Sequence, residues 1–270
     1  MGKIELVASD IDGTLLFDWR ARSLGDDVLA AVEHVLDRGI VFAAASGRQY
    51  FNVRGLFGRL ADRVLYICEN GMLVMDSGEV FYRAPVDSAA MVQMAEFILA
   101  SKTLHLLLNG VSACYVHRAD QLFYERTETG LGNLTRPFDD ARDVADDLVK
   151  AGIWYEDPAD PLALAEVDEL KARFGDTFEL VSSGVDWYDI VPRGQSKAVA
   201  LKKVGESLGI APANMAAFGD NYNDVPMLDL VGHPFAMESG KPELLRLNPR
   251  VRPCRSVPET LETLLRPAAK

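Results

Sequence analysis

The chain lacks several features that mark specialised protein classes. It has three cysteines, Cys68, Cys114 and Cys254, which lie far apart and form no Cys-x-x-Cys pair. This excludes a disulfide framework and a zinc cluster. No apolar run approaches the roughly 20 residues of a membrane-spanning helix, and the short apolar segment 4–9 runs directly into an acidic loop, which fits no signal peptide. We therefore expect a soluble, reduced, cytoplasmic protein.

Basic charge is also scarce. There are 28 Lys and Arg against 40 Asp and Glu, so the formal net charge is −12. Nucleic acids and anionic membranes require a basic face, so neither is expected as a partner. What is present is ordinary globular composition, with 49% apolar residues, which excludes a disordered chain. The length of 270 residues allows one large domain or two smaller ones.

The first part of the chain alternates strands and helices. Apolar runs predict strands at 4–9, 40–45 and 64–68, and helical spacing predicts a helix over 26–38, which Gly39 ends. A strand, a helix and a second strand at this spacing indicate a right-handed unit of a parallel sheet.

The last part of the chain repeats this pattern, with a helix predicted over 196–208, a strand over 215–218 and helices over 225–230 and 258–265. The two parts together predict an α/β fold with a Rossmann-like parallel-sheet core made of residues 1–84 and 191–270.

The middle of the chain has a different pattern. Helices are expected at 87–100 and 162–174, and strands at 104–108, 113–116 and 178–182. These elements predict an α+β domain over 85–190 that is inserted into the core. Five Asp residues fall within 139–147, where we expect a solvated loop or a helix start rather than a metal cluster.

Acidic side chains follow two of the predicted core strands. Asp10 and Asp12 come after the first strand, and residues two apart in extended backbone point the same way. The carboxyl ends of strands are where open α/β sheets bind ligands. Gly219-Asp220-x-x-Asn223-Asp224 follows the strand at 215–218 and offers the oxygen ligands that Mg²⁺ takes. The alternatives are a solvated turn at Asp10 and an Asp/Asn-rich turn at Asp220.

Two further motifs suit an anion. Ser46-Gly47-Arg48 follows the second strand and offers a hydroxyl and backbone N–H groups to a phosphate, unless Ser46 merely caps a helix. Lys197 lies at a predicted helix start, where its charge opposes the helix dipole. A nearby anion would explain that position, and an ordinary surface lysine is the alternative.

Taken together, the four motifs resemble those of the haloacid dehalogenase-like hydrolase superfamily. They are Asp10-x-Asp12-Gly13-Thr14, Ser46-Gly47-Arg48, Lys197 and Gly219-Asp220-x-x-Asn223-Asp224. The long insertion between the second and third motifs resembles the type-C2 cap of the Cof-type branch, or subclass IIB. Residues 236–240 depart from the family's usual run, so the last loop is expected to differ.

The resemblance implies a Mg²⁺-dependent phosphomonoester hydrolase that acts on small phosphorylated metabolites, sugar phosphates foremost, through an aspartyl-phosphate. It implies that Asp10 is the nucleophile, and that Asp12 protonates the leaving alcohol and then deprotonates water. Asp12 would therefore start protonated, with nearby carboxylates raising its pKa. The resemblance further implies that Lys197 places its positive charge beside the Asp10 carboxylate and a phosphate oxygen, and that Ser46, Gly47 and Asn223 bind the other phosphate oxygens. Mg²⁺ would be held by Asp10, the backbone carbonyl of Asp12 and Asp220. Asp224 would orient Lys197 or a metal-bound water.

Two other functions stay open at this stage. A sugar phosphomutase would pass the phosphoryl group to a sugar instead of water, and a non-catalytic regulator would only bind a phosphometabolite. The presence of both Asp10 and Asp12 argues against the regulator, because a binding protein needs no acid/base beside a nucleophile. The expected partner is a small phosphoester, and neither the physiological substrate nor the oligomeric state can be read from the sequence.

Overall fold

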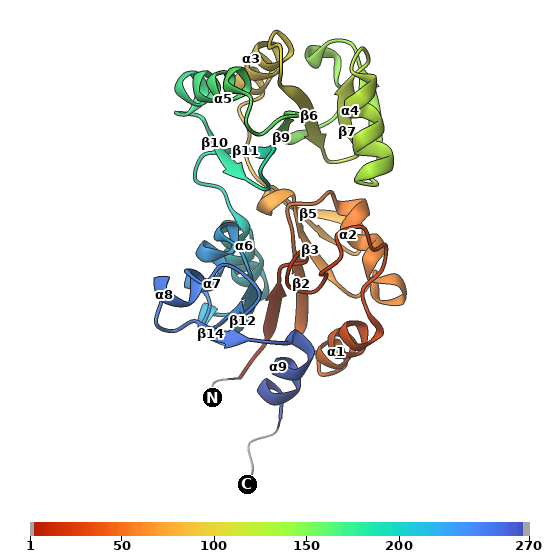
Figure 1. The fold of residues 1–270 in the computed structure, drawn as a ribbon. Helices are drawn as coiled ribbons and strands as arrows, with labels where there is room; N and C mark the ends of the chain where they lie inside the picture. The colour runs from red at the N-terminus through yellow and green to blue at the C-terminus, as the bar shows by residue number, and fades with distance from the viewer. Residues whose placement is uncertain (1–2, 267–270) are drawn as a thin grey trace. The chain divides into compact units, whose positions relative to one another are not determined.

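The computed structural model describes residues 3–266, apart from the side chain of residue 247. Its contacts divide the chain into two compact units, drawn in Figure 1. The core unit comprises the chain up to Tyr82 and from Ser196 onward, and the inserted unit runs from Arg83 to Gln195. The insertion expected from the sequence spans 85–190. Each unit has its own sheet and its own apolar core, and the two are described separately below.

The core unit is built on an eight-stranded sheet with the order β14-β13-β12-β1-β2-β3-β4-β5. β1 lies between β12 and β2, parallel to both, so that Leu6 is beside Met215 and Val41. The strands are β1 (Leu6–Ser9), β2 (Val41–Ala45), β3 (Leu65–Cys68), β4 (Leu73–Asp76), β5 (Glu79–Arg83), β12 (Met215–Gly219), β13 (His233–Met237) and β14 (Arg252–Cys254). Pairing is parallel from β14 through β3, and β4 is antiparallel to β3. The expected parallel-sheet fold class is confirmed.

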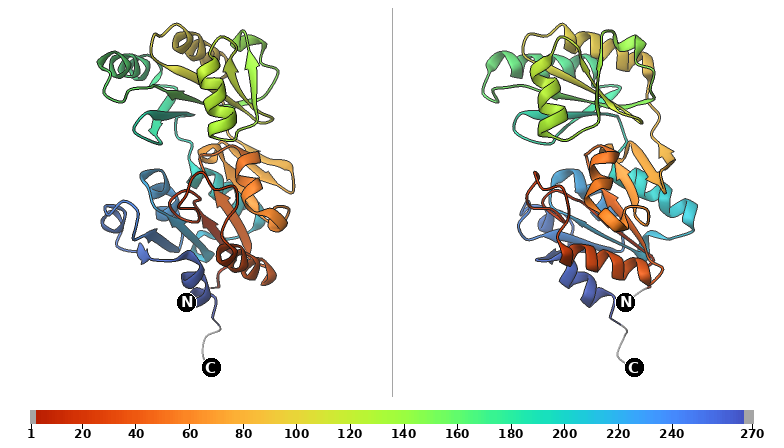
Figure 2. Two further views of the ribbon diagram at one scale, coloured as in Figure 1. Left: turned by 45° about the vertical axis from the view of Figure 1, so that its right-hand side comes forward. Right: turned by 90° about the vertical axis from the view of Figure 1, so that its right-hand side faces the viewer.

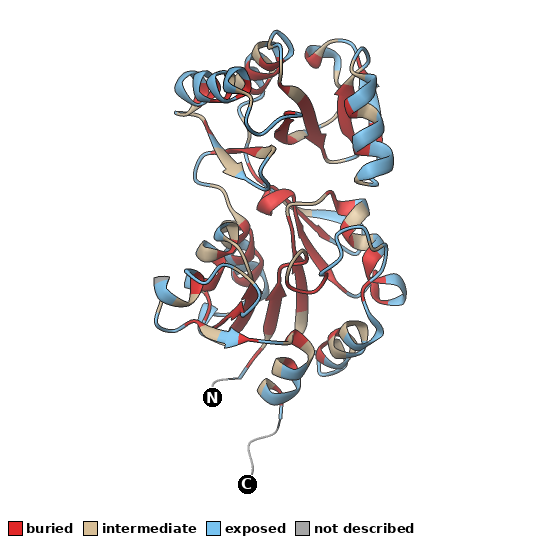
Figure 3. Ribbon diagram, viewed as in Figure 1, coloured by how far each residue is buried: buried red, intermediate tan, exposed pale blue. Residues whose placement is uncertain are grey.

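Burial explains why β1 is central. All four of its residues are buried, and the middle strands of the sheet are buried along their length in Figure 3. Such strands are covered by helices on both faces and are therefore continuously apolar. On one face Ala8 and Ala43 pack with Leu201 of α6. On the other, the ring of Phe42 lies 6.2 Å from that of Phe57, at the end of α2.

The helices of the core unit follow the expected pattern closely. They are α1 (Asp26–Asp37), α2 (Tyr50–Leu56), α6 (Lys197–Leu208), α7 (Val225–Leu230), α8 (Leu244–Leu247) and α9 (Val257–Leu264), with single 3-10 turns η1 (Gly58–Leu60), η2 (Glu69–Gly71), η5 (Pro212–Asn214) and η6 (Tyr222–Asp224). The four helices predicted in this unit are present within one residue at each end. The sequence does not predict helices α2 and α8 or strands β4, β5, β13 and β14.

The inserted unit has a six-stranded sheet with the order β10-β11-β9-β6-β7-β8, antiparallel except for β7 and β8. Helices α3 and α5 pack against one face of it, and α4 lies on the opposite face, as Figure 2 shows. Its elements are α3 (Ser88–Leu99), β6 (His105–Gly110), β7 (Cys114–His117), α4 (Gln121–Glu125), the π-helical turn η3 (Arg126–Gly130), β8 (Thr135–Phe138), the 3-10 turn η4 (Ala141–Asp143), β9 (Leu148–Trp154), α5 (Pro161–Phe174), β10 (Phe178–Ser182) and β11 (Trp187–Pro192).

The Asp-rich segment 139–147 forms a loop with the short turn η4, as expected. Several of its acids have structural partners, and two of them are described here. Asp140 caps η4 by accepting from the N–H of Arg142, and Asp146 accepts from the N–H of Ser112 and the hydroxyl of Tyr115, both at 2.9 Å. The bonds of Asp146 tie the loop to the hairpin of β6 and β7, so this acid stabilises the inserted unit.

No helix in the span 3–266 combines the length and apolarity that crossing a bilayer requires.

Candidate active site

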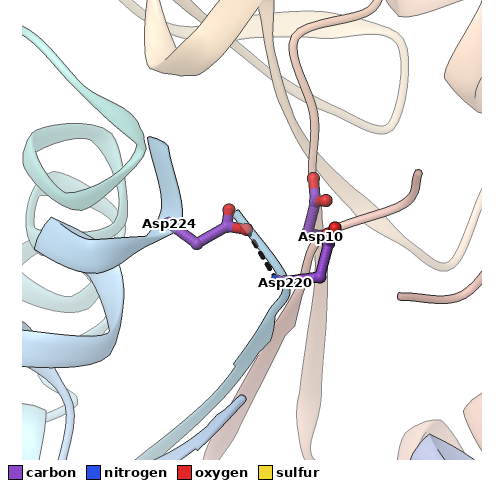
Figure 4. Close-up of side chains that lie close together, drawn as sticks. All are labelled: Asp10, Asp220 and Asp224. Atoms are coloured by element: carbon purple, nitrogen blue, oxygen red, sulfur yellow. Dashed lines mark hydrogen bonds between the residues drawn. The ribbon is translucent and has the colours of Figure 1, made fainter. Parts of the chain in front are cut away.

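Three carboxylates meet at the carboxyl end of two neighbouring strands of the core sheet, β1 and β12. Asp10 follows β1 directly, and its N–H donates to the carbonyl of Phe218 in β12 at 2.9 Å. Because β1 and β12 are parallel neighbours, Asp220 follows β12 at the same edge. One oxygen each of Asp10, Asp220 and Asp224 lie within 4.8 Å of one another (Figure 4).

Lys197 lies inside this cluster. Its ammonium donates to Asp10 Oδ1 at 2.6 Å and to Asp224 Oδ1 at 2.8 Å, and the residue is only 1% exposed. It is the first residue of α6, which Ser196 caps by accepting from the N–H of Val199. The capped helix start thus places the lysine between two carboxylates. Their negative charges offset the unfavourable interaction of a positive charge with the N-terminal end of the helix dipole.

Asp224 organises the loop after β12. It is fully buried, and its Oδ2 accepts from the N–H groups of Asp220 at 3.0 Å and Asn221 at 3.1 Å. The first of these bonds is the dashed line in Figure 4. Since its Oδ1 accepts from Lys197, both oxygens of Asp224 are engaged by the protein. Asp224 therefore fixes the backbone that carries Asp220.

Asp220 is held from the side of the first motif. Its Oδ1 accepts from the hydroxyl of Thr14 at 3.1 Å. Gly13 has a φ of +82°, and a Cβ on it would collide with the Asp220 carboxylate. The motif Asp-Gly-Thr therefore requires its glycine for two reasons, the left-handed backbone and the space that Asp220 occupies.

The electrostatics of the cluster are dominated by burial. Burial first, and then the charge of Asp224, raise the pKa of Asp10 well above its ordinary value, although Lys197 acts in the opposite direction. Burial likewise raises the pKa of Asp220. Burial alone would lower the pKa of Lys197, but the carboxylates of Asp10 and Asp224 outweigh it and raise that pKa. Lys197 therefore keeps its proton, but its single positive charge is not enough to balance the three carboxylates.

The net charge of the cluster can be counted. Three carboxylates face one ammonium, which leaves an excess of two negative charges when all are ionised. A divalent cation would balance it, and carboxylate oxygens are the ligands that hard divalent ions prefer. One buried acceptor near the cluster is also unsatisfied: Oδ1 of Asn223 has no hydrogen-bond partner within residues 3–266. A metal-bound water would supply that donor, so the residues fit a divalent metal.

The second motif lies in the loop after β2. Ser46 is 1% exposed, and its Oγ accepts from the N–H of Arg48 at 3.1 Å, which leaves the hydroxyl proton to donate elsewhere. Helix α2 begins only at Tyr50 and has Gln49 as its N-cap residue. Helix capping by Ser46 is therefore wrong.

A loop not singled out for the site in the sequence analysis joins the second and fourth motifs. Asn70, at a φ of +58°, donates its N–H to the carbonyl of Ser46 at 2.9 Å, and its Oδ1 accepts from Nδ2 of Asn223 at 3.2 Å. In the sequence, Glu69-Asn70-Gly71 has the composition of a turn, and Asn70-Gly71 adds to the resemblance to the Cof-type branch. Its role in the site depends on β2 and β3 being neighbours, which brings the loops after these strands together.

Asp12 stands apart from the cluster of Asp10, Asp220 and Asp224. Its carboxylate is bound by the guanidinium of Arg48, with Nε at 2.7 Å from Oδ2 and a second contact between Nη2 and Oδ1. The partner that the structure gives the Asp12 carboxylate is therefore a guanidinium of the second motif. Arg48 itself was visible in the motif but had been given no role.

The arrangement defines a class of protein: an α/β enzyme whose acidic, lysine-containing site lies at the carboxyl end of a parallel sheet. A family model for haloacid dehalogenase-like hydrolases matches residues 7–254, so the chain belongs to that family. The match covers all four motifs and the inserted unit, and the family resemblance drawn from the motifs is confirmed.

Curated relatives span most of the chain. A 5-amino-6-(5-phospho-D-ribitylamino)uracil phosphatase of Escherichia coli is 26% identical over 87% of this chain and 86% of its own length. An HMP-PP phosphatase of Yersinia enterocolitica is 28% identical over 92% of this chain and 88% of its own. A crystal structure from Eubacterium rectale matches the fold with a TM-score of 0.86, at 24% identity over 98% of this chain and all of that one.

Proposed function

We propose that the protein is a Mg²⁺-dependent phosphatase that hydrolyses small phosphorylated metabolites through an aspartyl-phosphate on Asp10. One observation carries the proposal: a carboxylate that is 6% exposed lies 2.6 Å from a buried ammonium, within a cluster of three carboxylates that this single ammonium does not balance when they are ionised. A group that only stabilised the fold would not need this arrangement, because an unbalanced buried charge is costly. The two curated relatives described above are phosphatases, which supports the same reaction.

The metal would be held by Asp10, the backbone carbonyl of Asp12 and Asp220. Mg²⁺ at that place would neutralise the excess charge and lower the repulsion between the Asp10 carboxylate and an anionic phosphoester. Thr14 and Asp224 keep Asp220 in position through the bonds described above.

In the first half of the reaction, an oxygen of Asp10 attacks phosphorus and the leaving alkoxide departs with a proton from Asp12. Lys197 keeps the Asp10 carboxylate oriented and adds positive charge next to the phosphate. The phosphate oxygens are bound by three groups: the hydroxyl of Ser46, which donates its proton, the N–H of Gly47 and the amide of Asn223. In the second half, Asp12 takes a proton from the water that attacks the aspartyl-phosphate.

The test is a phosphate-release screen over many phosphometabolites in Mg²⁺, ranked by kcat/KM, with Asp10→Asn as the blank. Sugar phosphates are the class we expect at the top, and the panel includes 5-amino-6-(5-phospho-D-ribitylamino)uracil and HMP-PP. Substrate consumption without phosphate release, dependent on a sugar bisphosphate, would replace hydrolysis by a mutase reaction. Binding of phosphometabolites without turnover across the panel would make the protein a non-catalytic regulator.

A further inference from the structure

The contact between Asp12 and Arg48 has no part in the mechanism proposed above. It is bidentate: Nε and Nη2 of Arg48 face the two oxygens of Asp12, with the Nε–Oδ2 distance 2.7 Å. The Asp12 side chain is 43% exposed and that of Arg48 only 16%. The guanidinium is therefore held within the protein, while the Asp12 carboxylate is open to solvent.

Arg48 is fixed by bonds to two other segments. Its Nη1 donates to Oδ1 of Asn52 on α2 at 3.1 Å, and its Nη2 donates to the carbonyl of Trp19 at 3.0 Å. Its backbone N–H donates to Ser46 Oγ. The guanidinium therefore cannot swing away without breaking contacts to α2 and to the segment after the first motif, and its orientation sets that of Asp12.

Stability alone gives a weak reason for this arrangement. An ion pair with a half-exposed partner contributes little to folding, because water screens it and both side chains lose freedom. The pair would serve a purpose if the direction of the Asp12 carboxylate matters. A proton-transfer group must meet its partner at hydrogen-bond distance, and orientation of such a group accounts for large rate factors.

The bidentate contact suits one half of the proposed reaction. When water attacks the aspartyl-phosphate, Asp12 has already given its proton to the leaving alcohol and acts as a carboxylate. A carboxylate offers two acceptor oxygens to the two parallel N–H donors of Arg48. The contact therefore holds Asp12 in the direction from which it takes the proton of the attacking water.

We propose that Arg48 is the positioning residue of Asp12 for hydrolysis of the aspartyl-phosphate, an inference that rests on the proposed function. In that step the water oxygen forms a bond to phosphorus while its proton passes to an Asp12 oxygen. The bond between phosphorus and the Asp10 oxygen breaks, and its electron pair returns to Asp10 as a carboxylate. Asp12 then carries the proton that it gives to the next leaving alcohol.

The experiment compares Arg48→Met and Arg48→Lys with the wild type on p-nitrophenyl phosphate in saturating Mg²⁺, by stopped flow and in the steady state. p-Nitrophenolate leaves without a proton, so formation of the aspartyl-phosphate should be unaffected. For Arg48→Met we expect kcat and KM to fall together by about 100-fold, the lower end of the usual range for proton-transfer catalysis. We also expect a burst of one p-nitrophenol per site and kcat/KM within about threefold of wild type. Arg48→Lys should recover only part of kcat, because an ammonium cannot grip both oxygens.

A mutant cycle separates positioning from direct substrate binding. If Arg48 acts through Asp12, Arg48→Met should cost nothing further in the Asp12→Asn background. A fall in kcat/KM with no burst, or a multiplicative loss in the double variant, would overturn the proposal. The matched control is Arg54→Met on α2, the helix that follows Arg48; its partner Asp62 lies on the surface, and we expect no change in its kinetics.

The same data distinguish failure of this inference from failure of the proposed function. If wild-type protein shows no Mg²⁺-dependent turnover that Asp10→Asn abolishes, the phosphatase itself is refuted and Arg48 has nothing to position. If wild type turns over and Arg48→Met is unchanged in kcat while it remains folded by circular dichroism, only the role of Arg48 is wrong. Arg48→Lys, which keeps the charge, covers the case in which Arg48→Met does not fold.

Discussion

Replacing Lys197 by Met tests the charge balance of the site. The ammonium is 1% exposed and lies 2.6 and 2.8 Å from two buried carboxylates, so its removal leaves three carboxylates without an internal cation. Breaking a buried ion pair by removing one partner costs about 3–5 kcal/mol. We expect a loss of that size in the free energy of unfolding of the core unit when metal is removed by a chelator.

The metal dependence makes the test specific. The excess negative charge rises from two to three in Lys197→Met, so saturating Mg²⁺ should stabilise the variant more than the wild type, through binding to the folded state alone. Hydrogen exchange resolved by peptide is the assay, because two units can unfold separately and a single transition would mix them.

Lys150→Met is the matched control. Lys150 is also buried and pairs with Asp189 at 2.7 Å, but in the inserted unit. Its loss should destabilise that unit by a similar amount, and Mg²⁺ should not change the difference from wild type. If Lys197→Met destabilised the core unit by less than about 1 kcal/mol in chelator, or if Mg²⁺ affected both variants equally, the reasoning about the charge cluster would be refuted.

Four further predictions follow from the same geometry. Asp10→Asn should lower kcat by at least about 10⁴-fold while the protein stays folded, and near wild-type phosphate release would show that another residue is the nucleophile. Gly13→Ala should cost about 1–3 kcal/mol and most of the Mg²⁺ affinity, because its positive φ and the Asp220 carboxylate both exclude a Cβ; calorimetric titration checks this. Asp224→Asn should cost about 1–3 kcal/mol, because an amide cannot accept from Lys197 and from two backbone N–H groups together; urea unfolding measures it. In chelator, stability of the core unit should fall as pH rises from about 4 toward the raised folded-state pKa of Asp10, because the folded state holds the proton longer than the unfolded one, and Mg²⁺ should remove this trend; a pH series of unfolding curves that shows stability rising over that range would contradict it.

The elements that the sequence predicts well are those whose burial pattern is simple. β1 and β2 are continuous apolar runs, and α1 and α7 have clear helical spacing, so their bounds come close to the observed ones. The missed strands β9 and β11 each carry a charged residue in the middle. Lys150 and Asp189 pair with each other in the folded sheet, and this long-range pairing is what makes each acceptable there. A pattern of single residues cannot show it.

The site has the same division. The motifs indicate which strand ends carry Asp10 and Asp220, because the order of elements predicts parallel neighbours. The partners of individual side chains depend on loops whose course tertiary contacts determine. Asp12 illustrates this, since strand alternation predicts that it points the same way as Asp10, whereas in the structure its carboxylate pairs with Arg48 and does not belong to the cluster of Asp10, Asp220 and Asp224.

The most direct test of the central claim is to trap the covalent intermediate. Wild-type protein is mixed with substrate and Mg²⁺, quenched within the turnover time, reduced with borohydride to convert an acyl phosphate to an alcohol, and digested for mass spectrometry. The account predicts a reduced aspartate at Asp10 alone, dependent on Mg²⁺ and absent from Asp10→Asn. Turnover of substrate with no modified residue, or modification at a residue other than Asp10, would contradict it.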